Sequence, residues 1–130
     1  MQIEITLSNS LQDYLEGILN LAENHEKVRI TDLAEYLGIT KPSATSAAKI
    51  LVKMGLLHHD KYGPLELTGT GLEVASEVRR RHNLLKEFLV SVLGVPVKTA
   101  EAEACLMEHS ISPDTFIKLV NFLETHNATP

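Results

Sequence analysis

The stretch TDLAEYLGITKPSATSAAKILVKMGLL, residues 31–57, decides the fold of this chain. Its first part predicts a helix that Thr31 caps and Gly38 ends, because a threonine hydroxyl accepts a bond from the first turn and glycine tolerates a left-handed terminus. Its second part predicts a helix that begins at Pro42 and ends before Gly55, since proline is favoured in a first helical turn. Two short helices joined by a tight turn are typical of a helix-turn-helix.

The flanking segments extend this unit in both directions. Residues 56–67 predict two short strands around the turn at 61–64, and a helix-turn-helix followed by such a ribbon is a winged helix-turn-helix. Upstream, apolar residues at helical spacing predict a helix over residues 10–23. Residues 3–7 alternate between apolar and polar side chains, which predicts a short strand or an extended arm.

The second half of the chain is predicted to be helical throughout. A long helix is expected from about residue 70 to residue 93, a shorter one over 97–109, and a last one over 113–124 that Ser112 caps. The fold class is therefore mostly α. We expect a winged helix-turn-helix domain over 1–70 and a helical domain over 71–130.

The bulk composition limits the possible functions. Of 130 residues, 44% are hydrophobic and 22% are charged, as in soluble globular proteins. No apolar run is long enough to cross a membrane, the start does not resemble a signal peptide, and a single cysteine suits a reducing compartment. We therefore expect a cytoplasmic protein without membrane association.

DNA binding is one hypothesis for the helix-turn-helix. The net charge of −5 opposes broad attraction to nucleic acid, but residues 41–61 carry four lysines and one aspartate, a local charge of +3. The inner face of the second helix is predicted to comprise Ala44, Ala47, Leu51 and Met54. On its outer face, hydroxyls can approach base edges and lysines can neutralise phosphates. The candidate DNA contacts are Lys41, Pro42, Ser43, Thr45, Ser46, Lys49, Lys61 and Tyr62.

The partners follow from this geometry if DNA is the ligand. A helix-turn-helix normally binds palindromic double-stranded DNA as a dimer, so the helices over 71–130 are expected to dimerise. The same arrangement also occurs in domains that bind proteins, and a regulator that senses a small molecule or a protein partner stays an alternative.

A second pattern lies in the stretch EACLMEHS, residues 103–110. Cys105, Glu108 and His109 fall on one face of a helix, and Glu101 joins the same stripe one turn earlier. Thiolate, carboxylate and imidazole are all ligands of first-row metals. Further candidate ligands are Asp13, Glu16 and His82.

Each of these residues also has an ordinary structural explanation. Asp13 could cap a helix with Ser10, His109 could stabilise a helix C-terminus, and Cys105 could fill the core. Glu16 could be solvated, and His82 could continue the basic surface of the three arginines before it. A catalytic Cys–His pair lacks the motifs that accompany a nucleophile, so we do not expect an enzyme.

Five segments in this order resemble one protein family. They are LQDYLEGI, the helix-turn-helix stretch, LELTGTG, RRHNLLKEFL and EACLMEHSIS. The chain is similar, over about residues 7–124, to the diphtheria toxin repressor family of iron- and manganese-dependent repressors, in its short form without an SH3-like domain. The resemblance implies metal-activated repression by a homodimer that binds a palindromic operator.

The resemblance also implies roles for individual residues. Asp13 and Glu16 match ligands of manganese-type members, and His82, Glu108 and His109 match ligands found in the family. Cys105 matches the iron type, and Glu101 falls where iron-type members place a histidine of a second site. Lys86 departs from the family, which usually has a carboxylate there, and a lysine ammonium cannot bind a metal. The expected cofactor is Fe(II) or Mn(II), and Zn(II) or Co(II) is expected to bind in vitro because affinity follows the Irving–Williams order.

Overall fold

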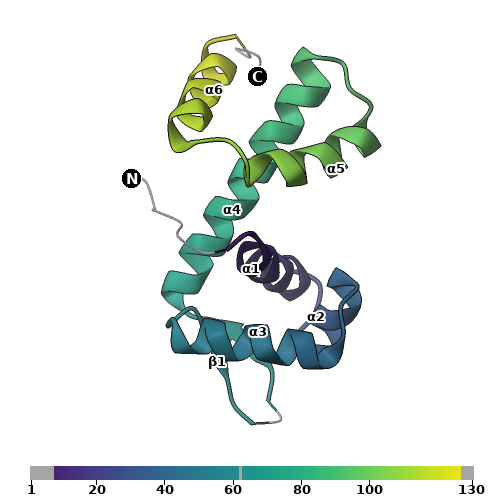
Figure 1. Ribbon diagram of the computed structural model, residues 1–130, viewed down its shortest axis with the longest axis vertical. Coiled ribbons are helices and arrows are strands. Elements are labelled where there is room, and N and C mark those ends of the chain that lie inside the picture. The colour runs from purple at the N-terminus through teal and green to yellow at the C-terminus, as the bar shows by residue number, and fades with distance from the viewer. Residues whose placement is uncertain (1–7, 62, 127–130) are drawn as a thin grey trace. The chain divides into compact units, whose positions relative to one another are not determined.

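The computed structural model describes residues 8–61 and 63–126, and these residues form two compact units that are divided between Val78 and Arg79 (Figure 1). The predicted arm at 3–7 and Tyr62 lie outside the described residues. We call the two parts the first unit and the second unit.

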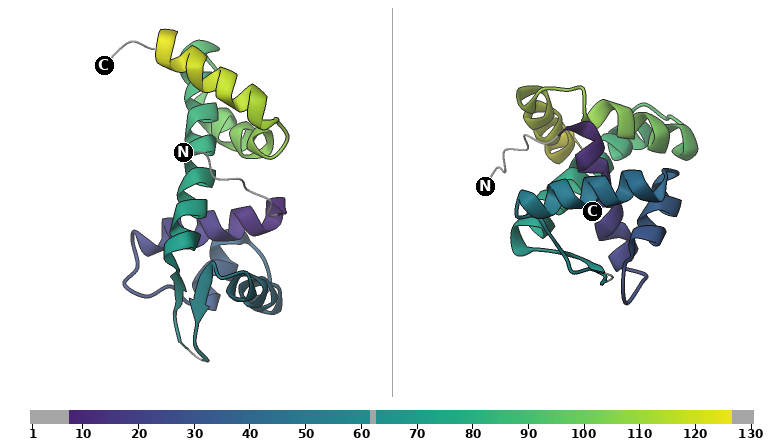
Figure 2. Two further views of the ribbon diagram at one scale, coloured as in Figure 1. Left: turned by 90° about the vertical axis from the view of Figure 1, so that its left-hand side faces the viewer. Right: turned by 60° about the horizontal axis from the view of Figure 1, so that its bottom comes forward.

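The first unit is a winged helix-turn-helix, as the sequence predicts. Its elements are α1 (Asn9–Ala22), α2 (Ile30–Leu37), α3 (Lys41–Lys53), β1 (Leu57–His59), β2 (Leu65–Leu67) and the beginning of α4 (Gly69–Glu87). The strands β1 and β2 are antiparallel, with Leu57 opposite Leu67 and His59 opposite Leu65. Figure 2 shows this two-stranded ribbon beside α3.

Local hydrogen bonds explain where α2 and α3 begin and end. Gly38 ends α2 with a φ of 67°, as predicted, and the Thr40 hydroxyl accepts a bond from the Ser43 N–H at 3.2 Å at the start of α3. The prediction that Thr31 caps α2 is wrong. The helix begins one residue earlier, because the Asp32 carboxylate reaches back to accept a bond from the Arg29 N–H at 2.9 Å.

Aliphatic side chains from all three helices fill the core of the first unit. Leu15 of α1, Leu33 of α2 and Leu51 of α3 are fully buried, and small residues of α3 such as Ala44 allow the helices to approach closely. The predicted inner position of Met54 is wrong. It is 47% exposed, because α3 ends at Lys53 and the chain turns away at Met54.

The second unit contains the rest of α4, the π-helical segment η1 (Phe88–Val92), α5 (Val97–Glu108) and α6 (Pro113–His126). Leu85, Leu89, Ala100 and Ala104 are its buried core. The Ser112 hydroxyl caps α6 by accepting a bond from the Thr115 N–H at 3.1 Å, as predicted. In the part of the chain that the structure describes, no helix is long and apolar enough to cross a membrane.

The long helix differs from the prediction in its last turn. The sequence predicts an α-helix to residue 93, whereas residues 88–92 widen into a π-turn before Gly94, where φ is 73°. Bulky and β-branched residues, among them Phe88 and Val90, lower the α-helical propensity of this segment. The rings of Phe88 and Phe122 of α6 also meet in a T-shaped arrangement, with 6.3 Å between centroids.

Gly71 gives a direct test of how tightly α4 meets the segment between α3 and β1. A Cβ atom at Gly71 would lie 1.9 Å from the carbonyl oxygen of Leu56, whereas a Cβ at Gly69 would meet nothing within 4 Å. We predict that Gly71→Ala lowers the free energy of unfolding by about 1–3 kcal/mol, since backbone atoms must move apart. Gly69→Ala is the matched control and should be neutral or stabilising by up to about 1 kcal/mol. Urea denaturation followed by circular dichroism measures both, and equal effects would contradict the close approach.

Candidate metal centre and DNA-binding surface

His82 is the central side chain of the candidate metal centre. It lies on α4, is 7% exposed, and has a carboxylate oxygen at each ring nitrogen. Nδ1 is 3.2 Å from Oε1 of Glu108, and Nε2 is 2.8 Å from Oε1 of Glu101. A neutral imidazole has only one N–H to donate, so the second contact needs a further proton, on the imidazole or on a carboxyl group, or a metal ion in its place. His82 is therefore a buried, doubly contacted group and not part of an exposed basic surface.

Cys105 and Glu108 of α5 complete a cluster with His82. One ligand atom from each of the three residues lies within 4.8 Å of the other two. Glu108 is only 2% exposed, and a buried carboxylate is costly unless a cation or hydrogen-bond donor accompanies it. A thiolate, a carboxylate and an imidazole suit Fe(II), Zn(II) and Co(II), so the donor set fits a divalent metal ion.

Arg81 supports this cluster, although the sequence indicated only that it belongs to a basic run. Its guanidinium donates to the main-chain carbonyl of Glu108 at 2.9 Å and lies over the Phe116 ring, 5.2 Å from the centroid. A cation at the C-terminal end of α5 also interacts favourably with the helix dipole. The position of Arg81 next to His82 in the run RRRH was the available signal for this role.

Glu101 and Lys86 form an ion pair beside the cluster. The Lys86 ammonium is 3.0 Å from Oε2 of Glu101, and the side chain of Glu101 is 53% exposed. The Lys86 ammonium holds the pKa of the Glu101 carboxyl below its usual range; the contact with His82 acts in the same direction, and partial burial opposes both. Glu101 is not one of the three residues of the cluster.

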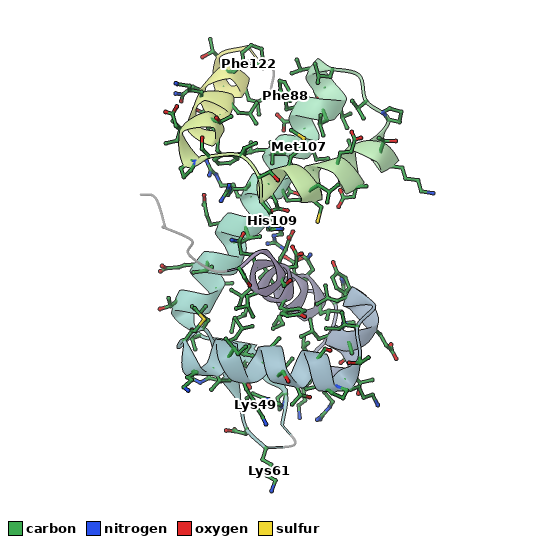
Figure 3. The ribbon with its side chains drawn as sticks, in the orientation of Figure 1. Lys49, Lys61, Phe88, Met107, His109 and Phe122 are labelled. Carbon is green, nitrogen blue, oxygen red and sulfur yellow. The ribbon has the colours of Figure 1, made fainter. Side chains whose placement is uncertain are left out.

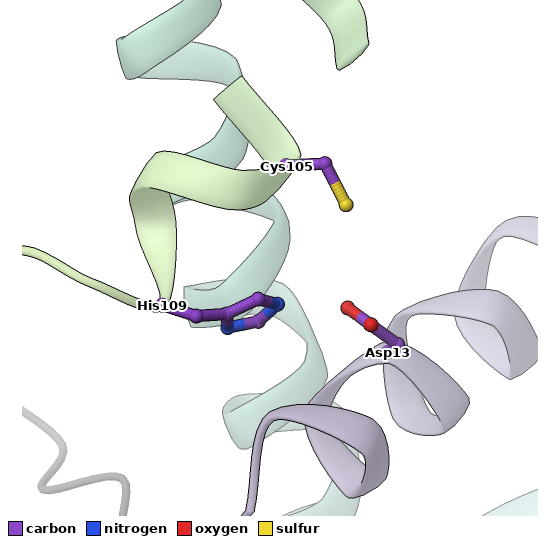
Figure 4. Close-up of side chains that lie close together, drawn as sticks. All are labelled: Asp13, Cys105 and His109. Carbon is purple, nitrogen blue, oxygen red and sulfur yellow. The ribbon is translucent and has the colours of Figure 1, made fainter. Parts of the chain in front are cut away.

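The remaining candidate ligands are distributed over both units. His109 is the residue that follows α5 at its C-terminal end. Its side chain points to the same side of that helix as the side chain of Cys105 (Figure 4). Asp13 projects from α1 and does not cap it, because the Ser8 hydroxyl accepts the capping bond from the Leu11 N–H at 3.3 Å. The capping explanation of Asp13 is therefore wrong. Glu16 is half-buried on the same helix.

The candidate DNA contacts lie on α3 and the wing. Lys49 on α3 and Lys61 on the ribbon point to the same side of the first unit (Figure 3). Thr45 is half-buried, and Tyr62 lies outside the described residues. The Ser43 hydroxyl accepts a bond from the Thr40 hydroxyl at 2.9 Å, so it is partly committed to the helix cap. The exposed members of the set are Lys41, Pro42, Ser43, Ser46, Lys49 and Lys61.

Comparison with known proteins gives two family matches that together cover almost the whole chain. Residues 6–65 match the iron dependent repressor N-terminal DNA binding domain, and residues 68–130 match the iron dependent repressor metal binding and dimerisation domain. The resemblance seen in the sequence is thereby confirmed, and the family is one of transcriptional regulators and not of enzymes.

Individual relatives agree with these matches. An HTH-type transcriptional regulator of Methanocaldococcus jannaschii is 38% identical over 119 residues, which cover 91% of this chain and 95% of that protein. The transcriptional regulator MntR of Escherichia coli is 34% identical over 118 residues, which cover 91% of this chain and 76% of that protein.

A solved structure, described as a manganese-dependent transcriptional repressor in complex with manganese, superposes with a TM-score of 0.81 at 33% identity. The match covers 88% of this chain and 52% of that one, and this chain spans a similar share of two other solved relatives, a manganese regulator and a repressor with bound Zn(II). With both domains matched in order, this chain belongs to the iron-dependent repressor family of metal-dependent transcriptional repressors.

Proposed function

We propose that this protein represses transcription by binding a palindromic DNA operator as a homodimer when Fe(II) or Mn(II) is bound. The observation that carries the proposal is the cluster of His82, Cys105 and Glu108. It lies within residues that match a metal-binding and dimerisation domain, in a chain whose N-terminal part matches a DNA-binding domain.

The proposed ligands have two kinds of support. For His82, Cys105 and Glu108, the support is their mutual distances and the burial of the histidine and the carboxylate. For Asp13, Glu16 and His109, it is ligand chemistry and the match to family positions. When bound, the metal supplies a divalent positive charge that offsets the charges of the buried carboxylate and the thiolate.

The choice of metal rests on ligand chemistry. Carboxylates suit Mn(II) and Fe(II), whereas a thiolate favours softer ions, so Cys105 favours iron over manganese. The family descriptions name iron, and the solved relative was determined with manganese. Zn(II) and Co(II) are expected to bind more tightly in vitro than Fe(II) or Mn(II), because intrinsic affinity follows the Irving–Williams order.

A metal ion can control DNA binding only if it binds the DNA-binding state of the protein more tightly than the other state. Ligands from α1, which belongs to the first unit, would couple the metal to the DNA-binding helices. A coupling free energy of roughly 1–3 kcal/mol corresponds to a change in operator affinity of about 5- to 150-fold. On DNA, Lys49 and Lys61 are proposed to contact phosphates, and Ser46 is proposed to approach base edges.

The first test measures operator affinity with and without metal. Duplexes selected from a random pool with Mn(II) present should bind about 5- to 150-fold more tightly with Mn(II) or Fe(II) than with chelator, in an anaerobic gel-shift assay. Glu108→Gln should lose this difference, because it removes the charge of a buried ligand. Glu103→Gln, an exposed neighbour on α5, should keep it. Equal binding by the wild type with metal and with chelator would contradict metal control.

The second test concerns the DNA surface. Lys49→Ala should weaken binding by similar factors for all duplexes and reduce the slope of log affinity against log salt concentration by about 1, because one phosphate contact is lost. The control is Lys118→Ala, an exposed lysine of α6 that pairs with Asp114 at 2.9 Å. Fluorescence anisotropy over a range of salt concentrations measures both, and an unchanged slope in Lys49→Ala would remove that residue from the interface.

A further inference from the structure

We propose that Lys86 and Glu101 form a positioning pair that holds His82 by Nε2, so that the metal binds Nδ1 and Glu101 is not a ligand. This inference rests on the proposed function, because it assigns roles around a metal bound by His82, Cys105 and Glu108. It replaces the role of ligand that the sequence resemblance suggests for Glu101.

Both oxygens of the Glu101 carboxylate are already occupied. Oε1 is 2.8 Å from Nε2 of His82, and Oε2 is 3.0 Å from Nζ of Lys86. Lys86 follows His82 by four residues on α4, so the two side chains lie on the same face of that helix. They hold one carboxylate of α5 between them, and these two contacts fix its orientation toward Nε2 of His82 and Nζ of Lys86.

The two nitrogens of His82 are therefore not equivalent. Nε2 faces the exposed carboxylate of Glu101, which is placed to accept a hydrogen bond from an Nε2–H. Nδ1 faces the buried Glu108, which is 3.2 Å away and belongs to the same cluster as Cys105. In metal sites the ligating histidine commonly donates its other N–H to a carboxylate, which fixes the tautomer and the ring orientation. Glu101 is placed to accept this bond.

The local charges also favour one divalent ion at this cluster. The ammonium of Lys86 offsets the carboxylate of Glu101, so these two groups contribute no net charge. Glu108 and the Cys105 thiolate then supply two negative charges beside a neutral His82, which match one divalent cation. Burial also favours a cation beside Glu108 over one beside Glu101. Glu108 is 2% exposed, so water compensates its charge poorly, whereas the Glu101 side chain is 53% exposed.

Nuclear magnetic resonance of the full chain with ¹⁵N-labelled histidine and bound Zn(II) tests the assignment directly. Zinc is diamagnetic, and long-range ¹H–¹⁵N correlations distinguish a metal-bound ring nitrogen from a protonated one; a His82→Gln variant identifies the signals. We expect zinc on Nδ1 and a proton on Nε2. Zinc on Nε2 would overturn this inference alone, whereas a wild type that binds no zinc, iron or manganese would overturn the proposed function as well.

Variants of the pair provide a second readout. Glu101→Ala should lower Mn(II) affinity about 10- to 100-fold in calorimetry without changing the number of ions per subunit, as expected for loss of a group that orients a ligand. Lys86→Met should also weaken binding, and Lys86→Arg should restore it, because arginine keeps the cation. Loss of one ion per subunit in Glu101→Ala, or equal affinities for Lys86→Met and Lys86→Arg, would overturn the inference. Circular dichroism checks that each variant is folded.

Discussion

The imidazole of His82, held between Glu101 and Glu108, connects α4 to α5 in the second unit. The two carboxylates come from one face of α5, so a single histidine fixes that face against α4. Arg81, the residue before it, holds the end of α5 through the Glu108 carbonyl. These polar contacts place Cys105 and Glu108 together, and a metal ion at the cluster would strengthen the same connection.

The first unit depends on contacts of a different kind. Its helices meet through leucine and alanine side chains, and glycine permits the close approach of α4 to Leu56. Such a core gives a rigid platform for α3 and the ribbon, which suits recognition of a fixed DNA shape. The cluster of His82, Cys105 and Glu108 lies on α4 and α5.

The sequence predicted most of the fold because its signals are local. Gly38 and Ser112 act within three or four residues of their own positions, so their spacing is sufficient to place helix ends. The start of α2 was missed because the Asp32 side chain, inside the helix, accepts the bond from the Arg29 N–H. The π-turn was missed because its packing, such as that of Phe88 against Phe122, involves residues distant in the sequence. For the candidate site, sequence spacing placed Cys105, Glu108 and His109 on one helix.

The contacts of His82 could not be derived from spacing, because its partners are 19 and 26 residues away in the chain. The ion pair of Lys86 with Glu101 could not be derived from spacing either, because it joins residues of two different helices. The sequence indicated that a lysine replaces a possible ligand, and only the three-dimensional arrangement shows which carboxylate it neutralises. Long-range polar contacts of this kind therefore help to distinguish candidate metal ligands from residues that orient a ligand.

X-ray absorption spectroscopy of the Zn(II)-loaded protein is the most direct measurement of the proposed centre. A metal shared by His82, Cys105 and Glu108 predicts one sulfur ligand at about 2.3 Å together with nitrogen and oxygen ligands at about 2.0–2.2 Å. The sulfur contribution should disappear in Cys105→Ser. A shell made only of nitrogen and oxygen in the wild type would show that the thiol is not a ligand and would contradict a centre built on this cluster.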